Sequence, residues 1–79
     1  MAAITNYEFG RRIGRSESMA SRIRAGRRRP GADTRDAIVR EFGLDPQAAM
    51  DAYVDAKTFG KFVRETVFAP NKDQPAKVA

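Results

Sequence analysis

Residues 14–30, GRSESMASRIRAGRRRP, are the stretch that decides the fold. Gly14 suits the left-handed position that ends a preceding helix, and Ser16 is a good N-cap for the next one. Gly26 can end this second helix, and Pro30 stops the run of arginines that follows it. The stretch therefore predicts a turn, a short helix and a basic loop.

The short helix has an apolar side and a polar side. Met19, Ala20 and Ile23 recur at helical spacing and form the apolar side. The polar side carries Glu17, Ser18, Ser21 and Arg22, and the helix is followed by Arg27, Arg28 and Arg29. Such a helix has the chemistry to enter the major groove of DNA, where polar side chains contact base edges and arginines bind phosphates.

Positive charge is concentrated in the first half of the chain, although the net charge of all 79 residues is only +5. Residues 11–40 contain ten arginines against Glu17, Asp33 and Asp36, a local balance of +7. The other residues carry five basic and seven acidic side chains, a balance of −2. This arginine block favours a polyanion as the partner, and a merely solvated basic helix face is the alternative.

The composition excludes several kinds of site. Without cysteine or histidine the chain has no disulfide, no metal site of the usual nitrogen or sulfur kind and no nucleophilic site built on those residues. Acid pairs such as Asp51 with Asp55 lie on a helix face typical of solvated surface. We therefore expect no enzyme, and no cofactor, metal or small-molecule ligand.

The sequence gives no sign of a membrane or of export. No apolar run approaches the ~20 residues of a membrane span. Met1–Ile4 lacks the charged and long apolar regions of a signal peptide. We therefore expect a cytoplasmic protein with no membrane partner.

A first helix is predicted over residues 6–13. Thr5 is a candidate N-cap, and Glu8 follows three residues later, as a reciprocal capping box requires. Glycine inside a helix costs up to ~1 kcal/mol relative to alanine, so Gly10 needs a reason. We expect that the next helix approaches the backbone closely there.

Beyond Pro30 a third helix is predicted over about residues 34–42, with Asp33 or Thr34 as its N-cap. Gly43 ends it, and Leu44 folds back over its last turn. Its two arginines, Arg35 and Arg40, either extend the basic surface or are ordinary solvated charges.

Asp45 and Pro46 open the next helix as N-cap and first helical residue. The apolar pattern then continues to residue 68, as one helix or as two that break near residues 58–60 with Thr58 as the second cap; Gly60 favours two. The predicted organisation is an arm at 1–4, a helix-turn-helix domain at 5–56, a C-terminal helix at 57–68 and a disordered tail at 69–79. No run alternates like a strand, so the fold is all-α.

About half of the chain resembles the lambda-repressor-like, or Xre/Cro, family of helix-turn-helix proteins. The matching residues are Phe9-Gly10, Ile13-Gly14, Ser16, the segment 18–23, Gly26, Arg27, Pro30 and Phe42-Gly43-Leu44. The resemblance implies sequence-specific binding of double-stranded DNA. It assigns Glu17, Ser18, Arg22 and Ser21 to base edges, and Asn6, Ser16, Arg27 and Arg29 to phosphates, with Arg28 in the same cluster.

The chain departs from the family in two respects. The family usually has a helix before the motif, where only Met1–Ile4 precede it here, and it commonly carries glutamate where this chain has Arg24, paired to an arginine on that helix. The core then lacks one wall. We hypothesise that a C-terminal apolar stripe supplies it, from the same chain or from a twofold partner: Phe59, Phe62, Val63 and Val67.

The preferred interpretation is a small transcriptional repressor, of the phage immunity or Cro kind, that occludes a promoter. A homodimer, formed in solution or only on DNA, is expected because base contacts are worth ~1–3 kcal/mol each and genomic discrimination needs ~4–10 kcal/mol. The alternatives are an antitoxin, an excisionase-like DNA-bending factor, or a protein-interaction module that keeps the helical scaffold without DNA binding. A bacterial cytosol is the expected location for the repressor.

Overall fold

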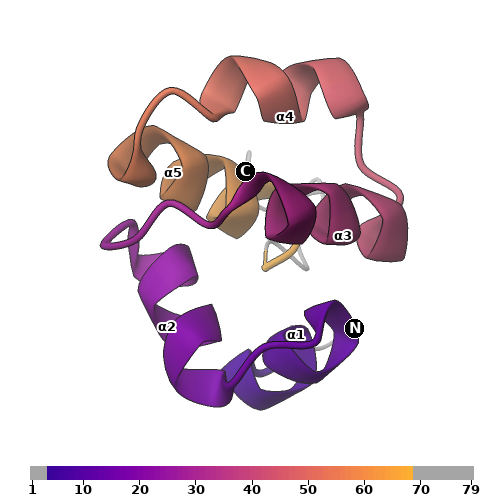
Figure 1. Ribbon diagram of the computed structural model, residues 1–79, viewed down its shortest axis with the longest axis vertical. Helices are drawn as coiled ribbons and strands as arrows, with labels where there is room; N and C mark the ends of the chain where they lie inside the picture. The colour runs from indigo at the N-terminus through magenta and orange to yellow at the C-terminus, as the bar shows by residue number, and fades with distance from the viewer. Residues whose placement is uncertain (1–3, 69–79) are drawn as a thin grey trace, which may run out of the picture.

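The computed structural model describes residues 4–68, and this range contains five α-helices and no strand. The helices are α1 (Asn6–Ile13), α2 (Glu17–Ala25), α3 (Ala32–Phe42), α4 (Pro46–Ala52) and α5 (Ala56–Thr66). α1 and α2 lie at one end of the molecule and α4 at the other, with α3 and α5 between them (Figure 1). The all-α prediction is confirmed. Residues 1–3 of the predicted arm and the whole predicted tail, 69–79, lie outside the described residues.

The five helices close a ring around a single core. α1 packs on α2 and α3, α4 packs on α3 and α5, and α5 packs on α2. Each helix therefore contacts two others, whereas the consecutive helices α2 and α3 do not pack directly on each other. All five helices and the second residue after α5 contribute to the buried core: Phe9, Ile13, Ala20, Ile23, Ala37, Ile38, Ala52, Phe59, Val63 and Phe68.

Both ends of α1 are set by the cap residues that the sequence predicts. The Thr5 hydroxyl accepts a hydrogen bond from the Glu8 amide at 3.0 Å, and Gly14 ends α1 with φ of 73°. Glycine is favoured there because other residues rarely adopt a positive φ. One half of the predicted capping box is wrong: the Glu8 carboxylate accepts hydrogen bonds from Arg11 and Arg12 instead of returning to Thr5.

The predicted start of α3 is wrong by two residues. The helix begins at Ala32, its N-cap is Gly31, and no side chain caps it. Thr34, one of the two expected caps, is buried, and its hydroxyl accepts a hydrogen bond from Arg15 Nε at 2.9 Å. The predicted end is confirmed, because Gly43 has φ of 61° and the following amide, that of Leu44, donates back to the last turn of α3.

Two helices follow Asp45, as predicted, but the break is in a different place. It lies at residues 53–55, and Asp55 rather than Thr58 is the N-cap of α5. Gly60 is inside α5 and buried. A Cβ at Gly60 would lie 2.5 Å from Gly26 Cα, so this glycine allows a close contact between backbones and does not end a helix.

The Asp55 cap is expected to make stability depend on pH. Hydrogen bonds from the amide and the hydroxyl of Thr58 lower the pKa of the Asp55 carboxyl, because they stabilise its charged form. A carboxyl with a lowered folded-state pKa adds stability above its unfolded pKa of about 3.9, and this stability is lost as the pH falls through the folded value. The drop in Tm caused by Asp55→Ala should therefore be large at pH 7 and shrink below pH ~4.

Thermal melts by circular dichroism at pH 7 and in acid measure this difference. Asp51→Ala is the control, because that carboxylate lies on α4 and caps no helix. An Asp55→Ala effect of equal size at both pH values would contradict the assignment.

Candidate nucleic-acid interface

α2 turns one face to the core and the other to solvent. Ala20 and Ile23 are fully buried and Met19 is half-buried against the core. All four residues that the resemblance assigns to base edges are exposed: Glu17, Ser18, Ser21 and Arg22. Residues three and four apart lie on the same side of a helix, so Ser18, Ser21 and Arg22 form one continuous polar strip.

Two glycines let α2 lie close to its neighbours. A Cβ at Gly10 would lie 2.7 Å from the carbonyl oxygen of Arg15 and 2.8 Å from that of Ser16. The expected close approach at Gly10 is therefore present, and the turn before α2 makes it. At the other end of α2, Gly26 lies against Gly60 of α5. The helix is thus held at both ends by backbone contacts that a side chain would block.

Side chains add further links to the end of α2. Arg64 of α5 donates to the Arg24 carbonyl at 2.6 Å. The guanidinium of Arg24 donates to Asn6 Oδ1 at 3.2 Å and lies 4.2 Å from the centre of the Phe68 ring. Where the resembled family has glutamate, this chain therefore has an arginine that joins α2 to the first residue of α1.

Most arginines of the block at residues 11–40 have partners within the chain. Four form ion pairs: Arg11 and Arg12 with Glu8, Arg35 with Asp36 and Arg40 with Glu41. Three donate to neutral oxygens: Arg15, Arg24 and Arg29. The pairing with Arg11 and Arg12 also lowers the pKa of Glu8, because both guanidinium groups stabilise the carboxylate.

Arg35 fits neither of its two predicted roles, part of the basic surface or an ordinary solvated charge. Its side chain is only 16% exposed, because it packs over the Tyr53 ring and pairs with Asp36 at 3.0 Å. Arg40, by contrast, is 70% exposed and its ion pair with Glu41 is loose, at 3.8 Å.

Three arginines of the block make no side-chain hydrogen bond or ion pair with any residue in the range 4–68: Arg22, Arg27 and Arg28. All three are exposed, and all three lie at or just beyond the carboxyl end of α2. The arginines of the block that have no side-chain partner within residues 4–68 are therefore concentrated beside the polar strip.

The remaining predicted phosphate contacts are in different surroundings. The exposed Ser16 hydroxyl accepts from the Met19 amide at 3.0 Å as the N-cap of α2, which leaves its hydrogen free to donate. Asn6 is half-buried and its side-chain Oδ1 accepts from Arg24. Arg29 is exposed, but its guanidinium donates to the Tyr53 carbonyl at 3.0 Å.

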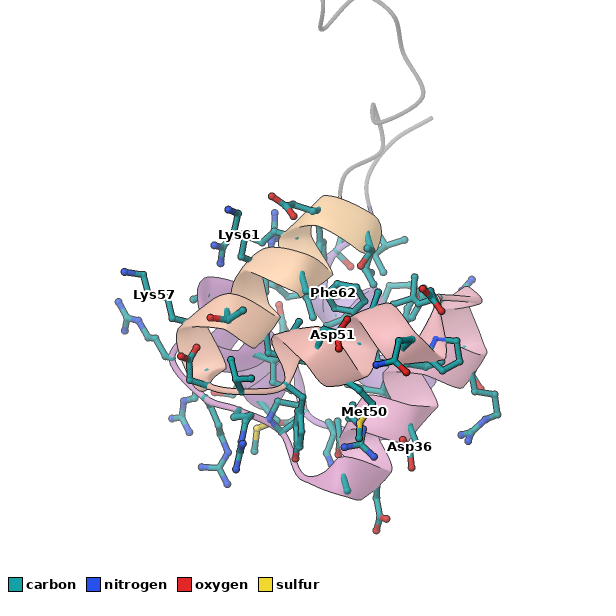
Figure 2. The ribbon with its side chains drawn as sticks, turned by 90° about the horizontal axis from the view of Figure 1, so that it is seen from above. Asp36, Met50, Asp51, Lys57, Lys61 and Phe62 are labelled. Carbon is teal, nitrogen blue, oxygen red and sulfur yellow. The ribbon has the colours of Figure 1, made fainter. Side chains whose placement is uncertain are left out.

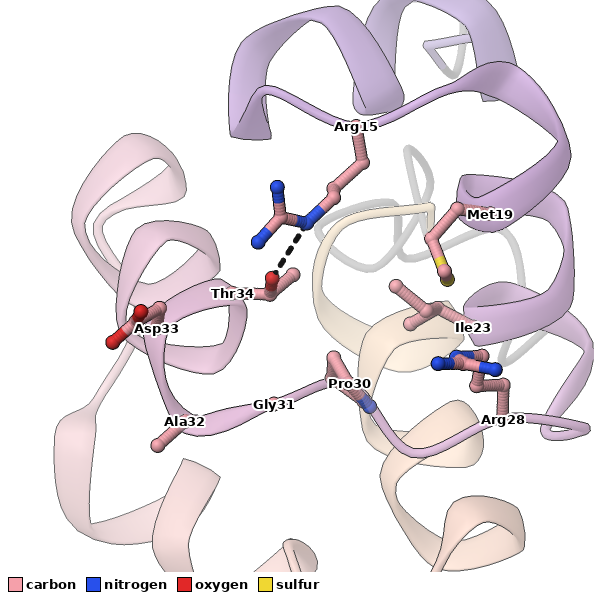
Figure 3. Close-up of a pocket in the computed structure, with 9 residues that line it drawn as sticks. All are labelled: Arg15, Met19, Ile23, Arg28, Pro30, Gly31, Ala32, Asp33 and Thr34. Atoms are coloured by element: carbon pink, nitrogen blue, oxygen red, sulfur yellow. Dashed lines mark hydrogen bonds between the residues drawn. The ribbon is translucent and has the colours of Figure 1, made fainter.

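A cleft of about 550 Å³ separates α2 from the start of α3 (Figure 3). It exists because these two helices do not pack directly on each other. Arg15 enters it from the turn before α2 and Arg28 from the segment after α2, with Met19 and Thr34 on its walls. The sequence pattern gave no sign of Arg15, because its partner Thr34 is 19 residues away.

The C-terminal stripe fills the core of the same chain. Phe59 and Val63 are fully buried, so none of their surface is left for a second protomer, and Phe62 and Val67 pack on the core while half-buried. The rings of Phe59 and Tyr53 pack edge to face, with centroids 5.6 Å apart and an interplanar angle of 81°.

The end of the molecule that α4 covers carries a different set of charged side chains from the exposed face of α2. Asp51 of α4 and Lys57, Lys61 and Phe62 of α5 lie on this side (Figure 2). Acidic and basic side chains are both present there, and Met50 of α4 is more than half exposed. This side therefore lacks the concentration of free arginines found beside α2.

Comparisons with protein-family models, with curated proteins and with solved structures give no match. Within residues 4–68 no three acidic side chains are close enough together to hold a metal ion. No helix in that range is long and apolar enough to cross a membrane.

Proposed function

We propose that this protein binds double-stranded DNA sequence-specifically through α2 and represses transcription by occluding a promoter. One observation carries the proposal: the exposed polar strip on α2, which includes Arg22, continues into Arg27 and Arg28, and none of these three arginines has a side-chain partner among residues 4–68. A solvated helix face has no need of such a concentration, since the other arginines of the block are paired within the chain. The resemblance to the lambda-repressor-like family supports the same proposal.

In this proposal the polar strip on α2 recognises bases, and the arginines that follow α2 bind phosphates. Arg22 is the best candidate for base recognition, because a guanidinium can bind guanine O6 and N7 together. Ser18 and Ser21 can donate or accept at neighbouring base edges, and Glu17 can accept from cytosine N4 or disfavour non-specific binding. Arg27 and Arg28 bind phosphates, and Arg15 adds a third guanidinium at the cleft that Arg28 lines.

A single α2 offers too few contacts for selective binding in a genome. Each base contact contributes ~1–3 kcal/mol, and the discrimination required is ~4–10 kcal/mol. We therefore propose a homodimer on a palindromic site, acting in a bacterial cytosol as a host or phage regulator.

Selection from a random DNA library at two salt concentrations tests the proposal. We expect the wild type to enrich a palindromic motif. Arg22→Ala should lose about 1–3 kcal/mol and relax one base position, whereas Arg27→Ala should weaken binding to all sequences evenly. The dependence of log K on log salt should be shallower by about 0.9 for Arg27→Ala, since one phosphate contact is lost.

Arg40→Ala is the matched control, because it removes another exposed arginine, on the α3 face next to α4. It should leave the motif unchanged. If no motif is enriched and binding disappears at moderate salt, the surface binds polyanions without sequence specificity and the repressor proposal fails.

A further inference from the structure

Tyr53, the residue that ends α4, makes most of its polar contacts with the loop between α2 and α3. We call residues 26–31 the arginine loop. The Tyr53 hydroxyl donates to the Pro30 carbonyl at 2.6 Å, and the Tyr53 carbonyl accepts from Arg29 Nη1 at 3.0 Å. Tyr53 lies 23 positions beyond Pro30, at the end of α4. It thus holds both a backbone group and a side chain of the arginine loop.

Two guanidinium groups also pack over the Tyr53 ring. The Cζ atoms of Arg29 and Arg35 lie 4.6 and 4.7 Å from the ring centroid. The ring itself is fixed against the core, since it packs edge to face with the buried Phe59. Attraction between cations and the aromatic ring, together with Asp36 beside Arg35, offsets the repulsion between the two positive groups.

We propose that Tyr53 is a positioning residue for DNA binding: it fixes the arginine loop so that Arg27 and Arg28 meet phosphates, while Arg29 serves Tyr53 and binds no phosphate. This inference rests on the proposed function. A loop that is already ordered loses less conformational entropy on binding, so holding it raises affinity without adding a contact to DNA. Arg27 and Arg28, which have no side-chain partner within residues 4–68, remain available to the ligand.

The proposal separates two kinds of arginine by salt dependence. Arg27→Gln removes a phosphate contact, so both the affinity and the slope of log K against log salt should fall, the slope by about 0.9. Arg29→Gln should lower affinity roughly threefold to tenfold and leave the slope unchanged, because the contacts with DNA are the same but the loop is less ordered. An equal loss of slope for Arg29→Gln would show that Arg29 binds phosphate and would overturn the assignment.

Variants of Tyr53 test the same point from the other side of the contact. Tyr53→Phe removes the hydrogen bond to Pro30 and keeps the ring, and Tyr53→Leu removes both. Affinity should fall in the order wild type, Tyr53→Phe, Tyr53→Leu, with an unchanged salt slope, measured by fluorescence anisotropy on a labelled duplex that carries the selected motif. NMR relaxation of the backbone amides, measured without DNA, should show faster motion in both Tyr53 variants than in the wild type at residues 26–29 and 31. Motion in α1 should be the same in all three proteins.

The binding measurements are made well below the Tm of every variant, with the folded fraction checked by circular dichroism, so that a general loss of stability does not appear as weaker binding. Should Tyr53→Leu not fold, Tyr53→Phe and Arg29→Gln still decide the matter. Unchanged affinity for both of these variants overturns the positioning role and leaves the proposed function standing. A wild-type chain that binds no duplex overturns both.

Discussion

Alanine at Gly60 is expected to destabilise the protein severely, although the same change usually stabilises a helix. In an exposed helix interior alanine is favoured over glycine by up to ~1 kcal/mol. Here the new Cβ would lie 2.5 Å from Gly26 Cα and 2.7 Å from Gly26 N, and neither atom belongs to a side chain that can rotate away. α5 must then move away from α2, and we expect a loss of about 3 kcal/mol or more.

Chemical denaturation of Gly60→Ala and wild type measures this loss directly. Gly43→Ala is the control, because Gly43 has φ of 61° and no atom within 4 Å of an added Cβ. It should cost only the ~1–2 kcal/mol of placing an L side chain in the left-handed region. A Gly60→Ala protein as stable as the wild type would show that α2 and α5 do not lie as close as described.

Truncating Phe59 to alanine should have an effect of similar size for a different reason. The side chain is fully buried, in edge contact with Tyr53 and tilted against Phe62 at 5.8 Å between centroids. Losing a buried phenylalanine typically costs ~3–5 kcal/mol, from lost burial and from the cavity left behind. In a domain this small that is a large part of the total stability, and we expect the Tm to fall by about 12 °C or more.

Phe62→Ala provides the comparison, because this neighbouring phenylalanine on the same helix is only half-buried. Its Tm should fall by clearly less. Equal effects of the two variants would mean that Phe62 is buried more deeply than a single chain buries it, as it would be against a second protomer.

Much of the fold could be predicted from the sequence because its signals are local. The caps at Thr5, Ser16 and Asp45 each bond an amide two or three residues away, and the glycines at 14, 26 and 43 end helices within the same turn. A short stretch of sequence contains both partners of each such interaction. The start of α3 was missed because its cap, Gly31, uses no side chain.

What could not be predicted depends on residues far apart in the chain. Glycine is a residue type that often interrupts a helix, so the sequence around Gly60 predicts a break. Only the approach of Gly26, 34 positions earlier, explains why a glycine lies inside α5. Asp55 and Thr58 both have side chains that can cap a helix, and in the structure Asp55 caps α5 by accepting from the Thr58 amide.

The candidate site divides in the same way. The exposure of Glu17, Ser18, Ser21 and Arg22 follows from helical periodicity, which the sequence contains. The difference between Arg27 and Arg29 does not, because it depends on the carbonyl of Tyr53, 24 residues further on.

The ring of helices also sets an order of events during synthesis. α2 is made early, yet one of its two neighbours in the ring is α5, which is made last among the five. A nascent chain that ends at residue 55 lacks Phe59, Val63 and Phe68, so α1 can pack on α2 but the part of α2 that α5 covers is still exposed. The apolar side of α2 is therefore fully covered only when translation has passed Phe68, and until then the chain exposes apolar surface that can aggregate.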